Sequence, residues 1–174
     1  MFKRINNNID LASQEQSISN YWDKIDAFDN SMQNRKNEKT FRFYDGPPFP
    51  TGSPHYGNLL AGVIKDIVPR YWTMRGYYVE RRFGWDVHGL PIEMEVQKQL
   101  GLDDHQQIKE FGIGKFNEAC RSQVQTNTEN WERVTRKIGR WVDFENDYKT
   151  MDIDFMESVW WVFKNLWEND LIYK

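Results

Sequence analysis

Two polar segments about thirty residues apart hold the residue types best suited to chemistry on a nucleotide. The first, 45–58, reads Asp-Gly-Pro-Pro-Phe-Pro-Thr-Gly-Ser-Pro-His-Tyr-Gly-Asn and separates a β-like run, 40–44, from a helical pattern that begins near Tyr56. The free N–H groups and the positive dipole end of such a helix attract anions. His55, at the start of that helix, can add a hydrogen bond or a charge where negative charge builds up on a phosphate.

The second segment, 84–91, reads Gly-Trp-Asp-Val-His-Gly-Leu-Pro and follows a second strand-like run, 77–83. Alternating strands and helices favour a parallel α/β sheet. In open sheets of that kind the ligand site lies beyond the carboxyl ends of the strands. Both polar segments fall there, so we expect His55 and Asp86 to face one shared cleft as parts of a nucleotide site.

The helices that must position these loops are indicated by apolar spacing. After a loose, polar lead-in at 1–14, Ser17 or Ser19 is expected to cap the first helix, and 30–39 is a polar link. The helix at 56–75 is expected to end at Gly76, and Pro69 is expected to bend or split it. The apolar positions are Ile18, Tyr21, Trp22, Ile25, Phe28 and Met32 in the first helix, and Leu59, Leu60, Val63, Ile64, Ile67 and Tyr71, expected to be buried, in the second.

A shorter helix is predicted to open at Pro91 and to stop at Gly101. The ranges 103–112 and 115–138 are then expected to form two solvated helices. Asp152 is expected to cap a last helix with one heavily apolar face, and 171–174 resembles the start of another strand. These patterns predict a lead-in and helix at 1–39, a nucleotide-binding segment at 40–102, and a helical extension at 103–174.

Composition narrows the function further. The 174 residues allow one domain with a core, 16% of them are aromatic, and the net charge of −3 disfavours a generally basic nucleic-acid binder. A single cysteine, Cys120, and three histidines disfavour a disulfide framework or a structural metal site. The amino terminus lacks a signal-peptide pattern, and no apolar run approaches the roughly 18 residues of a membrane span. A cytoplasmic protein without membrane contact is therefore expected.

The motifs themselves resemble a known family. Pro-His-Tyr-Gly-Asn is similar to the His-Ile-Gly-His signature of class I aminoacyl-tRNA synthetases. Asp-Gly-Pro-Pro-Phe and Gly-Trp-Asp-Val-His-Gly-Leu-Pro-Ile-Glu resemble the isoleucine-specific members in particular. The similarity runs from about residue 17 to the end and includes the stretches 139–141 and 150–152. It implies the first half of a Rossmann-type nucleotide-binding domain, with an N-terminal helix and a helical extension.

The resemblance also implies roles for individual residues. His55, Gly57 and Asn58 would bind ATP, with His55 and Asn58 stabilising charge at the α-phosphorus, and Asn58 stands where the family has its second histidine. Asp86 would pair with the ammonium group of the amino acid.

Three further positions complete the implied site. Gly46 and Pro47 would form one wall of the amino-acid pocket. His88 would orient the Asp86 loop.

The implied reaction is that of an isoleucine–tRNA ligase: isoleucine and ATP, with Mg²⁺, give an adenylate whose aminoacyl group passes to tRNA(Ile). The family's Lys-Met-Ser-Lys-Ser string is absent from these 174 residues. The resemblance therefore implies an N-terminal fragment with half an active site, inactive alone, of an enzyme that is a monomer at full length.

Alternatives stay open at the level of the residues. The chain could be a non-catalytic interaction module from a truncated synthetase, or a nucleotidyltransferase of another class. His55 could be an ordinary capping residue and Asp86 a turn residue. The arginines at 75, 81 and 82 are expected to be solvated edge charges. The tryptophan-rich cluster at 160–167 is expected to be either core or an interface that further domains would cover, and not a platform for stacking bases.

Overall fold

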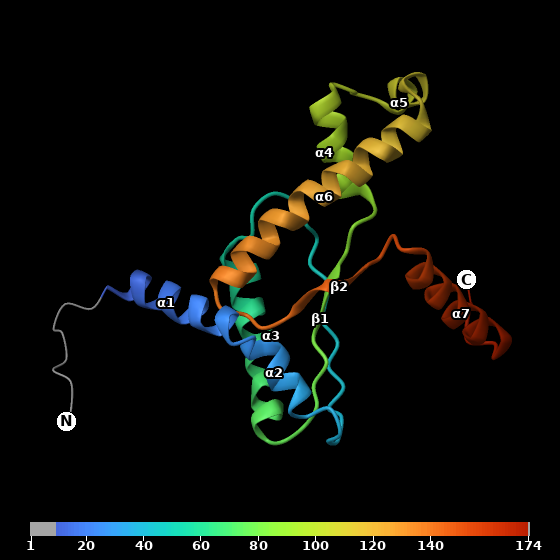
Figure 1. Ribbon diagram of the computed structural model, residues 1–174. Coiled ribbons are helices and arrows are strands. Elements are labelled where there is room, and N and C mark those ends of the chain that lie inside the picture. The colour runs from blue at the N-terminus through green and yellow to red at the C-terminus, as the bar shows by residue number, and fades with distance from the viewer. Residues whose placement is uncertain (1–9, 174) are drawn as a thin grey trace, which may run out of the picture.

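A computed structural model describes residues 10–173 and shows seven helices around a small parallel sheet in that range (Figure 1). The elements in chain order are α1 (Leu11–Lys24), α2 (Ala27–Gln33), α3 (Tyr56–Met74), β1 (Arg82–Trp85), α4 (Leu90–Leu100), α5 (His105–Phe111), α6 (Ile113–Lys137), β2 (Asp143–Lys149) and α7 (Ile153–Glu168). The predicted α/β class is confirmed. No helix within the described range is long and apolar enough to cross a bilayer.

The sheet consists of β1 and β2, which run parallel with a register irregularity between Arg82 and Gly84. Gly84 pairs with Tyr148, and a Cβ on Gly84 would lie 2.2 Å from the Tyr148 ring, so only glycine leaves room there. The core beside the sheet joins β1 to α4 and α6 through Phe83, Trp85, Val87, Ile92, Val96, Phe116, Val124, Trp131 and Val142.

The strand predictions were only partly right. The run 40–44 does lie parallel to the chain near Tyr78, but they share a single bridge, Thr40 with Tyr78, and no strand forms. The predicted strand 77–83 becomes regular only from Arg82, where the β2 backbone begins to pair with it. β2 was missed because its Asp, Glu and Asn residues have low strand propensity. The stretch 171–173 forms no strand either.

The first helix begins earlier than predicted and is broken. Asp10, not Ser17 or Ser19, caps α1 by accepting from the Ser13 N–H, so 11–14 is helical; residues 1–9 lie outside the described range. Asp26, with φ 47°, separates α1 from α2. The apolar spacing continues across the break because Trp22 and Phe28 both pack against Trp141, at 5.3 and 6.4 Å between ring centroids. α2 also takes up the start of the predicted link.

The predicted helix at 56–75 is confirmed as α3, which runs unbroken through Pro69, and Gly76 follows its end with φ 93°. Its apolar face is, however, mostly exposed rather than buried, because a two-stranded sheet covers only part of a 19-residue helix. The exposed members are Leu60, Val63, Ile64, Ile67 and Tyr71.

The C-terminal half contains the four predicted helices, α4, α5, α6 and α7, and two corrections. α4 has Pro91 in its first turn and ends at Gly101 in the left-handed region, as predicted. The helix α6 is not simply solvated, since Phe116, Val124, Trp131 and Thr135 are buried. The predicted helical extension also contains β2, a strand of the central sheet.

The last helix, α7, begins after Asp152 and projects away from the sheet (Figure 1). The Asp152 carboxylate accepts from the Lys149 N–H instead of from the first turn of the helix. Trp160, Trp161 and Trp167 are each about two-thirds exposed. Within the described residues, the tryptophan-rich cluster is therefore a surface and not a core.

Candidate active site

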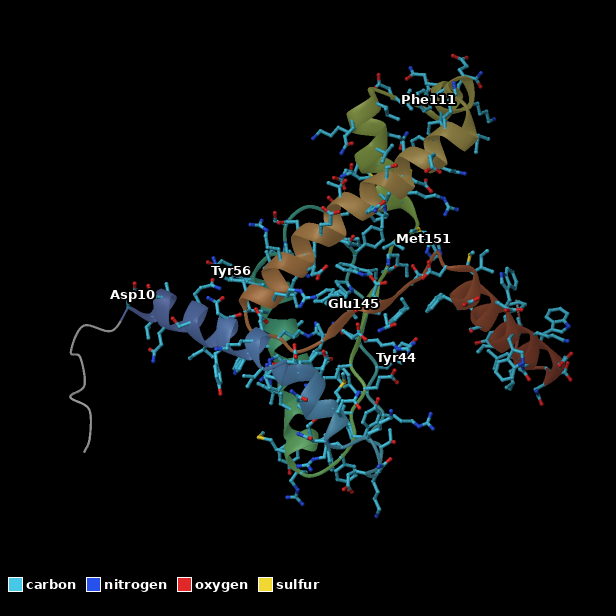
Figure 2. All side chains as sticks on the ribbon, viewed as in Figure 1. Asp10, Tyr44, Tyr56, Phe111, Glu145 and Met151 are labelled. Atoms are coloured by element: carbon cyan, nitrogen blue, oxygen red, sulfur yellow. The ribbon has the colours of Figure 1, made fainter. Side chains whose placement is uncertain are left out.

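His55 and Asn58 close the start of α3 in a reciprocal capping arrangement; Figure 2 labels the intervening Tyr56. The His55 Nδ1 accepts from the Gly57 N–H at 3.1 Å, and the Asn58 Oδ1 accepts from the His55 N–H at 3.0 Å. An accepting Nδ1 places the proton of a neutral imidazole on Nε2. The exposed His55 ring and the Asn58 amide group therefore both retain a donor for a ligand.

Gly57 leaves room for this geometry, and a side chain there would crowd the His55 ring. A Cβ at position 57 would lie 3.0 Å from the His55 Cε1 and 3.1 Å from its Nδ1. The absence of a side chain lets the imidazole fold back onto the first turn of α3. Packing of a ligand against Gly57 stays a prediction.

The loop that leads into His55 is held by α6, which sequence reasoning missed. Asn127 donates from its amide nitrogen to the Pro50 carbonyl at 2.6 Å, and the Trp131 Nε1–H donates to the Gly52 carbonyl at 2.9 Å. Asn130 donates to the Ser53 hydroxyl at 3.1 Å. Residues 127, 130 and 131 share one helical face, and this spacing could have indicated a contact surface on the helix. The polar composition of the helix instead favoured a solvated helix.

The two polar segments meet at the turn that contains Gly46 and Pro47 and at the loop that contains Asp86. The Asp86 N–H donates to the Pro48 carbonyl at 2.9 Å, which places the half-buried Asp86 next to the turn that contains Gly46 and Pro47. A half-buried carboxylate suits an ammonium group, because its oxygens can accept the N–H bonds of the ammonium.

Asp45, just before that turn, is the centre of a buried ionic cluster. Its side chain is fully buried, and the buried Arg140 pairs with its Oδ2. The Lys65 Nζ lies 2.9 Å from the Asp45 Oδ1 and donates a hydrogen bond to the Gly46 carbonyl at 2.6 Å. Because Lys65 belongs to α3, this cluster ties the Gly46 turn to the helix that starts at His55.

Tyr148, on β2, completes the support of this turn. Its hydroxyl donates to the Asp45 carbonyl at 2.8 Å, and burial raises the pKa of the phenol above its usual value. The phenol therefore remains a hydrogen-bond donor at neutral pH. Arg140 and Tyr148 lie 95 and 103 residues from Asp45 along the chain, and no local sequence pattern links them to it.

Thr150 joins Asp86 to His88, and it was also missed. Its Oγ1 lies 2.8 Å from the His88 Nδ1 and 3.4 Å from the Asp86 Oδ1, and it accepts from the Val87 N–H at 3.0 Å. This network supports the predicted role of His88 in the Asp86 loop. Thr150 follows β2, so its position became predictable only once β2 was known to pair with β1.

The predicted site residues thus form two groups. His55, Gly57 and Asn58 lie at the start of α3, while Gly46, Pro47, Asp86 and His88 lie where β1 ends. In the described part of the chain no hydrogen bond joins His55 or Asn58 directly to Asp86; the link runs through Lys65 and the loop at 45–54. Whether both groups face one cleft stays a prediction.

Arg81 does not match its expectation as a solvated edge charge. It is 2% exposed, lies over the Phe28 ring, and donates to the Pro69 carbonyl at 3.3 Å and to the Thr73 hydroxyl. Burial lowers the pKa of its guanidinium to about 10. Its role is to join β1 to α3. The described residues contain no group of three or more His, Cys, Asp or Glu side chains placed to hold a metal.

The family is decided by comparison with known proteins. The family model of tRNA synthetases class I (I, L, M and V) matches residues 17–174. This chain belongs to the class I tRNA synthetases. The predicted resemblance is therefore confirmed at the level of the family.

Relatives narrow the likeness within the class I tRNA synthetases. The chain is 51% identical over 174 residues to an isoleucine–tRNA ligase of Treponema denticola, covering 100% of this chain and 16% of the relative. It is 54% identical over 165 residues to that of Mycobacterium tuberculosis, covering 95% of this chain and 16% of the relative. The cytoplasmic isoleucine–tRNA ligase of Arabidopsis thaliana is 53% identical over 161 residues, which cover 92% of this chain and 14% of the relative.

A solved structure supports the fold. The ternary complex of Agrobacterium radiobacter K84 agnB2 LeuRS with tRNA and LeuAMS superposes with a TM-score of 0.61 at 23% identity, covering 95% of this chain and 19% of that one. The predicted fold class, the first half of a Rossmann-type domain of this synthetase class, is confirmed. The chain spans about a sixth of the length of the curated relatives named above.

Proposed function

We propose that the protein to which this chain belongs activates isoleucine with ATP and transfers the aminoacyl group to tRNA(Ile). The observation that carries this proposal is the contact between the Asp86 N–H and the Pro48 carbonyl. It places a carboxylate beside a backbone wall at the edge of the sheet, and Lys65 connects that wall to α3. The relatives at 51–54% identity are isoleucine–tRNA ligases.

In this proposal the chain contributes position and charge rather than covalent chemistry. The start of α3 and the donors of His55 and Asn58 bind the ATP phosphates. Asp86 binds the substrate ammonium, and the turn at 46–47 forms the pocket wall, so the substrate carboxylate can be held near the α-phosphorus. Attack of a carboxylate oxygen forms the bond to phosphorus, and pyrophosphate leaves with the electron pair of the broken P–O bond.

The proposal also covers the metal ion, the cellular location, the oligomeric state and the domain organisation. Mg²⁺ arrives bound to ATP and neutralises charge on its phosphates. The enzyme works in the cytoplasm as a monomer. The domain boundary at 39 is likewise proposed, whereas the one at 102 is not, because it would separate β1 from its partner β2.

Amino-acid-dependent exchange of labelled pyrophosphate into ATP tests the function, using protein expressed from the complete reading frame. Isoleucine should support exchange best. Valine should be poorer by about 10–200-fold, because one methylene in an apolar pocket is worth about 1–3 kcal/mol; isoleucine against valine in this enzyme is the standard example of that limit. Exchange with none of isoleucine, valine and leucine, or fastest exchange with leucine, would contradict the proposal.

Substitution of Asp86 by alanine should weaken isoleucine binding by at least about 30-fold. Once the bound substrate covers the half-buried Asp86, loss of one partner from this desolvated charge pair costs about 2 kcal/mol or more, since the ammonium group stays unpaired. Calorimetric titration with isoleucine measures the effect. Glu80→Ala is the matched control, because Glu80 forms only an exposed pair with Arg82. An isoleucine affinity unchanged in Asp86→Ala would remove the assignment.

A further inference from the structure

Thr150 occupies a fixed position opposite the end of β1. Its N–H donates to the Trp85 carbonyl at 3.0 Å, which continues the pairing of β2 with β1 by one residue. The residue is 7% exposed. Its hydroxyl is therefore placed by the sheet, and it points at the loop that immediately follows Trp85.

The Thr150 hydroxyl has three partners in that loop, and their chemistry decides where its proton lies. A hydroxyl donates once and accepts twice. The Val87 N–H, at 3.0 Å, can only donate, and the Asp86 carboxylate, at 3.4 Å, accepts. All three contacts are satisfied together only when the third partner, the His88 Nδ1 at 2.8 Å, is also a donor.

We propose that Thr150 is a positioning residue: its hydroxyl orients Asp86 for the substrate ammonium and holds neutral His88 as the tautomer with its proton on Nδ1. The part that concerns the substrate ammonium rests on the proposed function. The part that concerns the His88 tautomer rests on the hydrogen-bond geometry alone. Among the described residues, the second carboxylate oxygen of Asp86 accepts no hydrogen bond, so it is available to the amino acid.

The proposal predicts different effects of Thr150 on the binding of isoleucine and on the binding of ATP. Thr150 contacts the group at the end of β1, whereas His55 and Asn58 belong to α3. Loss of the hydroxyl should therefore disturb amino-acid binding more than ATP binding. A purely structural defect would affect both, because it would loosen the shared loop at 45–54.

The kinetic test compares Thr150→Val with Thr150→Ser in protein from the complete reading frame. The valine variant should raise the KM for isoleucine by about tenfold, the loss expected for a hydrogen bond to a charged group, with the KM for ATP within about twofold. The serine variant keeps the hydroxyl and should restore the KM for isoleucine to within about threefold. Thr126→Val, which removes an exposed hydroxyl on α6, is the control and should change neither constant.

The second test determines the His88 tautomer by ¹⁵N NMR. It requires neither an enzymatic activity nor that the Thr150→Val variant folds. Wild type and Thr150→Ser should show a protonated Nδ1 and an unprotonated Nε2 at a pH where the ring is neutral. A proton on Nε2 in the wild type, equal losses for isoleucine and ATP, or a serine variant that behaves like valine would overturn the proposal. Absence of amino-acid-dependent pyrophosphate exchange in the wild type would instead refute the proposed function. The His88 tautomer would still test the hydrogen bonds between Thr150, Asp86 and His88.

Discussion

Replacing His55 by alanine should slow formation of the aminoacyl-adenylate by about 10²–10³-fold, because a donor placed where charge develops contributes that much to a rate. The capping bond from the Gly57 N–H to Nδ1 leaves the Nε2–H of a neutral ring free for the ATP phosphates. Single-turnover measurement of adenylate formation, with protein from the complete reading frame, gives the rate directly.

The control for this prediction is His55→Asn, since asparagine is among the best capping residues. Both variants should lose the rate, but only alanine should also lose about 1 kcal/mol of stability through the missing cap. A rate within about threefold of wild type in either variant would refute the assigned role. A normal rate in His55→Asn alone would show that only the cap matters.

Replacing Arg140 by methionine should destabilise the loop at 45–54 by about 3 kcal/mol. The Asp45 side chain is fully buried, and Arg140, which is 8% exposed, is its most deeply buried partner. Removing the guanidinium leaves a buried carboxylate with Lys65 alone, and desolvation is then no longer offset. Hydrogen–deuterium exchange of the peptides that cover the loop should become markedly faster.

Two further variants serve as controls for the effect of Arg140→Met on hydrogen–deuterium exchange. Arg136→Met breaks an exposed pair with Glu132 and should change loop exchange little. The double variant Asp45→Asn with Arg140→Met removes both charges and should recover part of the protection, because the uncompensated charge is gone. Unchanged exchange in Arg140→Met, or a double variant that is worse than the sum of the two single variants, would contradict the account.

The helices were predictable wherever a local rule operates. Pro91 and Gly101 mark the ends of α4, and the motif before Tyr56 marks the start of α3, because capping depends on residues close in sequence. The strands were less predictable, because a strand needs a partner. β2 is polar by composition and becomes a strand only through its pairing with β1.

The candidate site shows the same division. The motifs indicated His55 and Asp86. The alternation of strands and helices indicated that the two polar segments lie at one edge of the sheet, and there the Asp86 N–H does bond to the Pro48 carbonyl. The supporting residues could not be found that way. Thr150 and Arg140 reach the site across more than sixty residues, and Arg81 looks like a surface charge until its packing against the Phe28 ring is known.

The three bonds from α6 to the loop at 50–53 have a mechanical consequence. Pro50, Gly52 and Ser53 are each bonded to α6, so this part of the loop is attached to one helix at three points. A displacement of this loop would therefore either break these bonds or draw the adjoining turn of α6 along with it.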